Sequence, residues 1–292
     1  MNKRREFLIQ FGLLAGGMCI LPSFTSVLND HGKRKFGIQL YSLRDELPKG
    51  VENVIKNIAN AGYSYVEGYG YSEKDGFWGL NPKTFKEMLS KYNLTCPSSH
   101  YDFGEYEQSG DLNIIKNYIE VAKGIGNEYI VIPYINPEIY KDEDKTKSWL
   151  VKLNKAAKLI KSEGLKLAYH NHQIEFYKMP NGKTGYEMLL EGTKPELVDF
   201  EMDIYWVINA GYDPIQLFKR YPNRFSLWHV KDMDKSNSSK NTEIGNGSID
   251  FKIIFKSEKL AGMKYAFMEQ ENFDIDAFES INKSFKYLKH TL

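Results

Sequence analysis

Residues 148–171 read "SWLVKLNKAAKLIKSEGLKLAYHN", a stretch that contains one complete helix-to-strand unit. Its first part has apolar residues at three- and four-residue spacing, which predicts an amphipathic helix. These residues are Leu150, Leu153, Ala157 and Ile160. Gly164 then marks the helix end, because glycine adopts the left-handed backbone of a helix C-terminus without strain. The segment "LKLAYHN" (165–171) follows at once and has the length and apolar content of a short buried strand.

The same unit recurs from Lys35 onward, and Gly62 and Gly126 also stand directly before strand segments. The eight strand candidates are "KFGIQLY" (35–41), "YSYVEGY" (63–69), "LTCPSSH" (94–100), "EYIVIPY" (128–134), "LKLAYHN" (165–171), "LVDFEMD" (197–203), "RFSLWHV" (224–230) and "KYAFMEQ" (264–270). Strands that alternate with helices form parallel sheets, and eight such units fit the usual size of a closed barrel. We therefore predict a single α/β domain, a (β/α)₈ TIM barrel, over residues 35–292.

The first residues have a different character. Residues 1–26 combine a basic start, a short apolar stretch and small polar residues, which is the layout of an export signal. "KRREFL" (3–8) also resembles a twin-arginine signal. We therefore expect an exported, periplasmic protein with no stable membrane span after signal cleavage, since the apolar stretch is short for a span. Cys96 would then be the only cysteine, and we expect it to be buried in a strand.

Composition limits the partners. The chain has 39 Lys and Arg against 38 Asp and Glu, so it lacks the basic surface that nucleic acid requires. A small neutral ligand fits this balance better. The 20 tyrosines and 4 tryptophans include rings that could stack on the apolar faces of a carbohydrate. We expect a small-molecule carbohydrate substrate and no nucleic acid, and the sequence leaves a homo-oligomer open.

Polar side chains gather where the predicted strands end. In a TIM barrel the active site forms at the C-terminal ends of the strands. Histidines and carboxylates together suit a divalent ion such as Mn²⁺, Co²⁺, Zn²⁺ or Mg²⁺, and the lack of cysteine argues against a structural zinc site. The residues at this rim are Gln39, Arg44, Glu67, His100, His170, His172, Glu175, Asp203, His229, Lys231, Asp232, Glu269 and Glu271.

Several motifs carry a resemblance. "DFEMDIYWV" (199–207), "WHVKD" (228–232), "GNGSIDF" (245–251) and "FMEQE" (267–271) resemble the xylose isomerase-like barrel family of sugar isomerases and epimerases, and "YHNHQIEF" (169–176) looks like a subgroup labelled sugar phosphate isomerase/epimerase. The resemblance implies one divalent ion held at the ends of strands five to eight. Carried over, it places the ligands at Asp203, His229 and Glu269. At strand five this sequence has His170 where the family has glutamate.

That difference bears on the mechanism the resemblance implies. The epimerases move a proton beside a carbonyl with two metal-bound glutamates. Here Glu269 would remain as one of them, and His170 would bind the metal. His172 or Glu175 would take over proton transfer, and Lys231 would steady an enolate oxygen. The expected substrate-binding residues are Gln39, Glu67, His100 and Trp206.

The expected function is a divalent-metal-dependent isomerase or epimerase that acts on a non-phosphorylated keto-sugar through an enediolate. Lyase- or hydrolase-like cleavage of 3-keto-glycosides is the close alternative, because the change at strand five breaks the pair of glutamates. A non-catalytic carbohydrate-binding barrel is a third interpretation. The G-x-G of "GNGSID" (245–250) lacks a third glycine, so we interpret it as a tight turn and not as a dinucleotide site.

Overall fold

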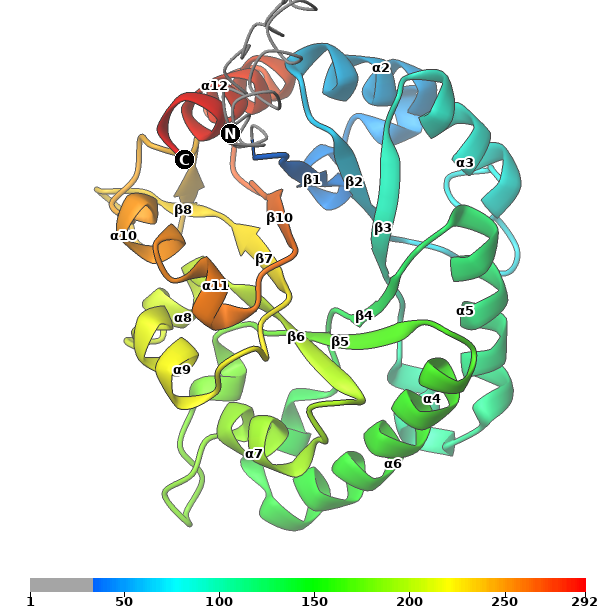
Figure 1. Cartoon of the computed structure of the whole chain (residues 1–292), viewed down its shortest axis with the longest axis vertical. Helices are drawn as coiled ribbons and strands as arrows, with labels where there is room; N and C mark the ends of the chain where they lie inside the picture. Colours follow the sequence, from blue (N-terminus) through cyan, green and yellow to red (C-terminus); the bar gives the residue numbers. More distant parts are fainter. Residues whose placement is uncertain (1–33) are drawn as a thin grey trace, which may run out of the picture. The chain divides into compact units, whose positions relative to one another are not determined.

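The computed structural model describes residues 34–292, and the predicted export signal lies outside them. Eight parallel strands close into a barrel in the order β1-β10-β7-β6-β5-β4-β3-β2 (Figure 1). The strands are β1 (Gly37–Gln39), β2 (Tyr65–Gly68), β3 (Thr95–His100), β4 (Tyr129–Ile132), β5 (Lys166–His170), β6 (Val198–Asp203), β7 (Leu227–Val230) and β10 (Tyr265–Met268). Each lies within its predicted segment, so the predicted (β/α)₈ barrel is confirmed.

Helices cover the outside of the barrel (Figure 1). They are α2 (Val51–Ala61), α3 (Pro82–Lys91), α4 (Gly104–Ser109), α5 (Leu112–Ile125), α6 (Glu143–Ser162), α7 (Gly185–Gly192), α8 (Ile204–Asn209), α9 (Pro214–Arg220), α10 (Phe251–Phe255), α11 (Glu258–Ala261) and α12 (Ala277–Thr291). Asn81 caps the start of α3 by accepting a hydrogen bond from the backbone N–H of Thr84 at 2.9 Å. Gly62 and Gly126 end α2 and α5 with positive φ angles, as their placement before strands predicted.

The inside of the barrel is apolar at one end and polar at the other. Residues two apart on a strand point to the same face, so Leu227 and His229 of β7 both point inward. An apolar cluster fills the barrel toward the N-terminal ends of the strands. Its buried members are Tyr65, Tyr129, Val131, Ala168, Leu227 and Phe267. On β2, β5, β7 and β10 the next inward residues, two positions further along, are Glu67, His170, His229 and Glu269. The interior of the barrel is therefore packed with apolar side chains toward the N-terminal ends of the strands, and it carries the polar side chains at their C-terminal ends.

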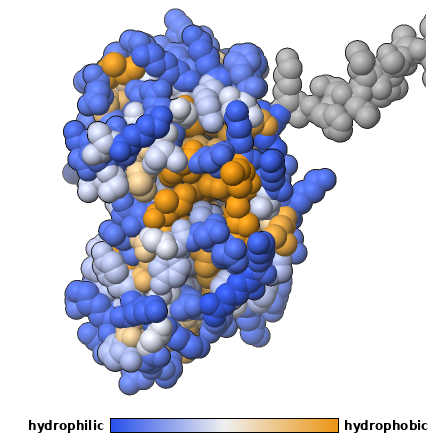
Figure 2. Space-filling view, turned by 90° about the vertical axis from the view of Figure 1, so that its left-hand side faces the viewer, coloured by the Kyte–Doolittle hydropathy of each residue, from blue (hydrophilic) through white to orange (hydrophobic). Residues whose placement is uncertain are grey.

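The segment 232–248, which follows β7, contains two short strands. β8 (Asp232–Met233) pairs antiparallel with β9 (Asn241–Thr242), a hairpin that the sequence did not reveal. Figure 2 shows one face of the domain, mostly hydrophilic with a hydrophobic area near its middle. Within residues 34–292, no helix is both long and apolar enough to cross a bilayer.

Candidate functional site

A cleft of about 390 Å³ opens at the C-terminal mouth of the barrel. Aromatic rings form much of its wall, and histidines and carboxylates form the rest. No lysine or arginine is among the residues that line it. The lining residues are Tyr41, Tyr69, Gly70, Tyr71, His100, Asp102, Pro133, Tyr134, His170, His172, Trp206, Glu269 and Glu271. Of the predicted rim residues, the cleft lining includes His100, His170, His172, Glu269 and Glu271 and does not include the others.

Asp203, His229 and Glu269 form the first ligand cluster, which we call the upper cluster. Nδ1 of His229 lies 3.0 Å from Oε2 of Glu269. One oxygen of Asp203 caps α8 by accepting from the backbone N–H of Trp206 at 3.0 Å, whereas its Oδ2 has no hydrogen-bond partner within the described chain. A buried carboxylate oxygen without such a partner suits a cation, and the mixed nitrogen and oxygen donors fit Mn²⁺, Co²⁺ or Zn²⁺.

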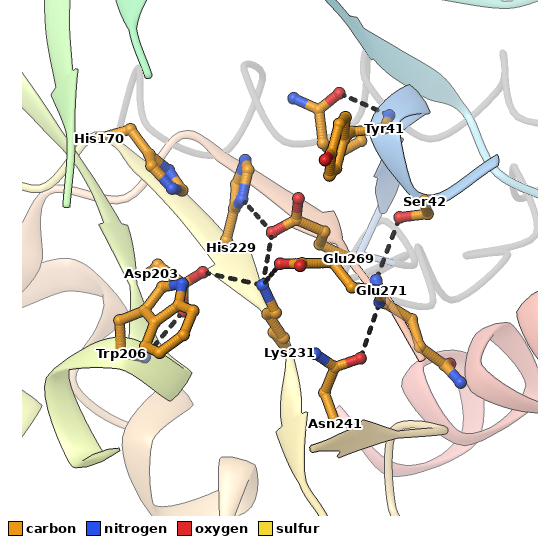
Figure 3. Close-up of polar contacts among 12 residues, drawn as sticks. Tyr41, Ser42, His170, Asp203, Trp206, His229, Lys231, Asn241, Glu269 and Glu271 are labelled. Atoms are coloured by element: carbon orange, nitrogen blue, oxygen red, sulfur yellow. Dashed lines mark hydrogen bonds and ion pairs between the residues drawn. The ribbon is translucent and has the colours of Figure 1, made fainter. Parts of the chain in front are cut away.

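Lys231 lies beside the upper cluster (Figure 3). Its Nζ is 3.4 Å from Oε2 of Glu269 and 3.8 Å from Oδ2 of Asp203, and it also contacts Glu271. Burial opposes the charge on Lys231, but these carboxylates outweigh it and raise the lysine pKa. The same pairing, with His229, holds the pKa of Glu269 well below its usual range despite burial. The ammonium group thus neutralises part of the ligand set.

A second set, which we call the lower cluster, consists of His100, His170, Glu201 and His229. Three imidazole nitrogens face Oε2 of Glu201, at 2.7 Å from His100, 3.1 Å from His170 and 3.2 Å from His229. The structure therefore groups His170 with Glu201 and does not group it with Asp203 and Glu269. The sequence analysis did not identify Glu201. This residue stands two positions before Asp203 in "DFEMD", so the two side chains share one face of the strand.

Gln39 and Glu67 lie beneath these clusters and are absent from the cleft lining. Oε2 of Glu67 accepts from Nε2 of Gln39 at 2.7 Å and lies 2.6 Å from Nε2 of His229. The hydroxyl of Ser98 donates to the other oxygen of Glu67 at 2.5 Å. Both predicted substrate contacts are fully buried, and Glu67 instead contacts the ring of His229 while Gln39 holds Glu67.

His172 and Trp206 are on the cleft wall, as predicted. Their ring centroids are 5.9 Å apart, and the ring of His172 is 6.1 Å from that of Tyr134. Burial, with the nearby charge of Lys231, lowers the pKa of His172 to about 4, so the ring is neutral at neutral pH. Its Nδ1 and the indole Nε1 of Trp206 have no hydrogen-bond partner among residues 34–292. Both are buried polar atoms in side chains that line the cleft.

Glu175 is not at the cleft. It is fully buried behind β5, where it accepts from the hydroxyl of Tyr169 at 2.9 Å and from the backbone N–H of His172 at 2.9 Å. Burial raises its pKa to about 7. The structure does not support proton transfer to a substrate by Glu175, because this side chain is fully buried in a short helical segment (Ile174–Phe176) after β5 and is not among the residues that line the cleft. Its contacts hold the loop that carries His172.

The "GNGSID" segment wraps around Asp232. One carboxylate oxygen of Asp232 accepts from the backbone N–H groups of Gly245 at 2.8 Å and Gly247 at 3.0 Å, and the other accepts from Ile249 at 3.1 Å. A Cβ on Gly247 would lie 2.2 Å from Asp232. The glycines are therefore needed for a tight turn around a carboxylate, and their amides cannot hold a phosphate.

Comparisons with known proteins agree with this geometry. The chain is 24% identical over 185 residues to an inosose dehydratase of Geobacillus kaustophilus. This match covers 57% of this chain and 58% of the relative. An inosose dehydratase of Mesomycoplasma hyopneumoniae is 27% identical over 214 residues, 65% of this chain and 67% of the relative. The chain thus spans about three fifths of the length of the curated relatives it matches.

A solved structure of a sugar phosphate isomerase/epimerase from Parabacteroides distasonis is similar over almost the whole chain. The identity is 29%, the TM-score is 0.79, and the similarity covers 93% of this chain and 99% of that one. The family described as xylose isomerase-like TIM barrel matches residues 55–290. The closed barrel, the cluster at its mouth and this match together lead to one conclusion: the chain belongs to the xylose isomerase-like TIM barrel family, a superfamily of enzymes.

Proposed function

We propose that this protein is a divalent-metal-dependent lyase that removes the proton beside the carbonyl of a keto-carbohydrate and expels a group from the next carbon. The observation that carries this is that the cleft presents the neutral imidazole of His172 for proton transfer, whereas its carboxylate Glu269 belongs to the upper cluster. Two carboxylates on opposite sides of a substrate suit epimerisation, in which a proton is removed from one face of a carbon and added to the other. One imidazole that can both accept and return a proton suits elimination.

The upper cluster fits a catalytic divalent ion. Asp203, His229 and Glu269 would hold it as three protein ligands, which leaves coordination positions for substrate oxygens. Oδ2 of Asp203, which has no hydrogen-bond partner among the described residues, supports this assignment. Burial raises the pKa of Asp203 to about 7, and a cation beside it would keep the carboxylate ionised. When bound, such an ion supplies Lewis-acid polarisation of the carbonyl oxygen.

In this proposal Nδ1 of His172 accepts the proton from the carbon beside the carbonyl. The electron pair of the broken C–H bond forms the new C=C bond as the C–O bond on the neighbouring carbon breaks. The imidazolium of His172 then returns the proton to the departing oxygen, which leaves as water or an alcohol. Lys231 does not line the cleft, so its ammonium, held near Glu269 and Asp203, would favour negative charge on the carbonyl oxygen only through its electrostatic field.

The surroundings favour a neutral, non-phosphorylated substrate. The cleft lining contains carboxylates and aromatic rings and no lysine or arginine. The backbone amides of Gly245 and Gly247 are already bonded to Asp232. The exposed ring of Tyr134 and the wall residues Tyr69 and Trp206 offer faces on which a carbohydrate could stack. Periplasmic export, which the first residues predict, agrees with this choice.

Epimerisation is the second candidate. It is favoured by the 29% identity to the Parabacteroides protein named as an isomerase/epimerase. Glu269 at the end of β10 and His172 after β5 are also separated by β7 and β6 around the barrel, so they could reach a ligand from different sides. In that case one group would remove the proton from the carbon beside the carbonyl, and the other would deliver a proton to the opposite face of the same carbon.

The test is incubation of the full chain, with Mn²⁺, in D₂O with inosose, with free ketoses and with 3-keto-glycosides, followed by NMR. The proposal expects metal-dependent loss of water or an alcohol from one of these keto-compounds, with the Asp203→Asn variant inactive. A stereoisomer carrying deuterium, without elimination, would establish epimerisation instead. Tight binding with neither product would favour a carbohydrate-binding barrel.

A further inference from the structure

We propose that the side of the cleft formed after β1 and β2 binds an aromatic leaving group, which is attached to the keto-carbohydrate through the oxygen that the reaction expels. Tyr41 and Tyr69 contact this group. Trp78, which is outside the cleft lining and packs on Tyr69, is a positioning residue. The inference rests on the proposed function and deepens it, because it names the class of alcohol that leaves.

The strand order divides the cleft into two halves. His172 and Trp206 follow β5 and β6, and the upper cluster comes from β6, β7 and β10, so the groups assigned to the reaction occupy four neighbouring strands. Tyr41 follows β1 and Tyr69 follows β2, and these strands lie opposite β5 and β6 in the closed order. Figure 3 shows Tyr41 and Trp206 on either side of His229. A sugar ring that reacts beside His172 therefore leaves the other half of the cleft for the group attached to it.

This other half, which follows β1 to β4, is rich in aromatic rings. Among the described residues that line it, Asp102 carries the one carboxylate, and there is no lysine or arginine. The cleft volume of about 390 Å³ lies within the range of about 300–1,000 Å³ typical of pockets that bury drug-sized ligands. An apolar group beyond the sugar ring therefore fits. The lining residues of this half are Tyr41, Tyr69, Gly70, Tyr71, His100, Asp102, Pro133 and Tyr134.

Tyr41 and Tyr69 form a corner at the edge of this half. Their ring centroids are 5.2 Å apart and their planes meet at 84°. Arg44, which is not among the lining residues, holds Tyr41 from outside, because its guanidinium lies over the ring at 4.8 Å and donates to the backbone carbonyl of Glu271 at 3.0 Å. Two perpendicular rings offer a flat ring one stacked and one edge-to-face contact, the arrangements that aromatic pairs prefer. A second sugar would place hydroxyl groups against the same apolar faces.

Trp78 has a backbone conformation that its residue type disfavours. Residues 77–80 read "FWGL", and the first and last of them exchange two backbone hydrogen bonds, at 2.8 and 2.9 Å. Trp78 and Gly79 between them have φ angles of 49° and 89°, as in a type I′ turn, where Asn-Gly is preferred. A bulky residue at this position is strained, and such strain is typical of functional sites. The ring of Trp78 packs against Tyr69, with centroids 5.2 Å apart, and so fixes one side of the corner.

The first part of the test is calorimetry with glucosides that carry no carbonyl and therefore cannot react. The full chain, loaded with Mn²⁺, should bind benzyl glucoside about tenfold more tightly than methyl glucoside. Tyr41→Ala and Trp78→Asn should each reduce this preference below about threefold. Asn-Gly suits the turn, so Trp78→Asn removes the ring and keeps the backbone. Tyr41→Phe, which keeps the ring, and Tyr177→Ala, at an exposed ring outside the lining, should retain the preference.

The second part compares kcat/KM for benzyl and methyl 3-keto-glucosides, whose leaving alcohols have similar acidity. His172 takes the proton from carbon 2, the electron pair of that C–H bond forms the double bond to carbon 1, and the bond from carbon 1 to the leaving oxygen breaks. His172 then returns the proton to that oxygen, which leaves as benzyl alcohol or methanol. We expect kcat/KM to be about tenfold higher for the benzyl compound, and to lose this advantage in Trp78→Asn.

The inference would be overturned by equal affinity for the two glucosides, by no measurable binding of benzyl glucoside, or by tighter binding of cellobiose. An unchanged preference in both Tyr41→Ala and Trp78→Asn would also overturn it. Its failure is separable from that of the proposed function. If neither keto-glucoside eliminates but the binding preference holds and falls in the two variants, the aromatic subsite stands and the lyase proposal fails. If both eliminate with equal kcat/KM and the two glucosides bind equally, this inference alone fails.

Discussion

Glu67 lies directly beneath His229, with its Oε2 2.6 Å from the histidine Nε2, although 162 residues separate the two in the sequence. Both side chains are fully buried. A carboxylate that accepts the N–H of a histidine fixes the ring orientation, so that its other nitrogen faces a metal. Here Nδ1 of His229 faces Glu269. Glu67 therefore positions His229 for the upper cluster.

The first prediction tests this role. Glu67→Gln keeps the size of the side chain but can turn an amide N–H toward His229, which weakens the orientation of the ring. We expect the affinity for Mn²⁺, measured by calorimetry, to fall about 10- to 100-fold while the protein remains folded. Glu52→Gln, which changes a surface glutamate paired with Lys91, should leave the affinity unchanged. An equal affinity in both variants would assign Glu67 a purely structural role.

The second prediction concerns Lys231, which is buried among Glu269, Asp203 and Glu271. Lys231→Met leaves these carboxylates without their cation, so the free energy of unfolding of the metal-free protein should fall by about 3–5 kcal/mol in urea titrations. Mn²⁺ should bind more tightly to the variant, because the ammonium no longer competes for the same oxygens.

Lys283→Met is the control for that variant. Lys283 forms an exposed pair with Glu279 on α12 at 2.9 Å, and its loss should cost less than about 1 kcal/mol. Weaker Mn²⁺ binding in Lys231→Met than in the wild type would mean that Lys231 supports the ion and does not compete with it.

The third prediction concerns pH. Burial raises the pKa of Glu175 from an ordinary value of 4.5 to about 7, so the folded protein holds this proton more tightly than the unfolded chain does. The contribution of Glu175 to stability is therefore complete below about pH 4.5 and is lost as the pH rises to about 7. Glu175→Gln mimics the protonated form. Between pH 5 and 8, its free energy of unfolding should fall about 2–3 kcal/mol less than that of the wild type.

Urea titrations at both pH values measure this difference. Glu196→Gln, at an exposed position, should show the same pH dependence as the wild type. Identical curves for Glu175→Gln and the wild type would show that Glu175 is ionised in the folded protein at neutral pH.

The fourth prediction concerns Trp206, whose indole Nε1 has no partner within residues 34–292. Trp206→Phe keeps an aromatic ring on the cleft wall but removes this donor. If a substrate hydroxyl accepts from it, KM should rise severalfold, equivalent to about 1 kcal/mol, with little change in kcat. Tyr177→Phe, on an exposed ring outside the cleft lining, should leave KM unchanged. A fall in kcat alone would place Trp206 in the chemical step.

The sequence by itself determined the barrel and the end of it that carries the chemistry. Helical spacing, glycines before strands and eight short apolar segments are local signals, and each observed strand lies within its predicted segment. The two-residue period then fixes that His229 and Lys231 share a face. By the same rule, Glu201 could have been found from its spacing to Asp203.

Only the tertiary structure decided which of the rim residues lie together in the upper cluster and which in the lower cluster. The curvature of the barrel brings Glu67, His100 and Glu201 from three strands to one point, and no local pattern encodes such distances. It also places Glu175 behind β5, since the chain turns into a short helical segment (Ile174–Phe176) after His172 and the strand period no longer applies. Side-chain direction follows the backbone path, and the path of a loop depends on what it packs against.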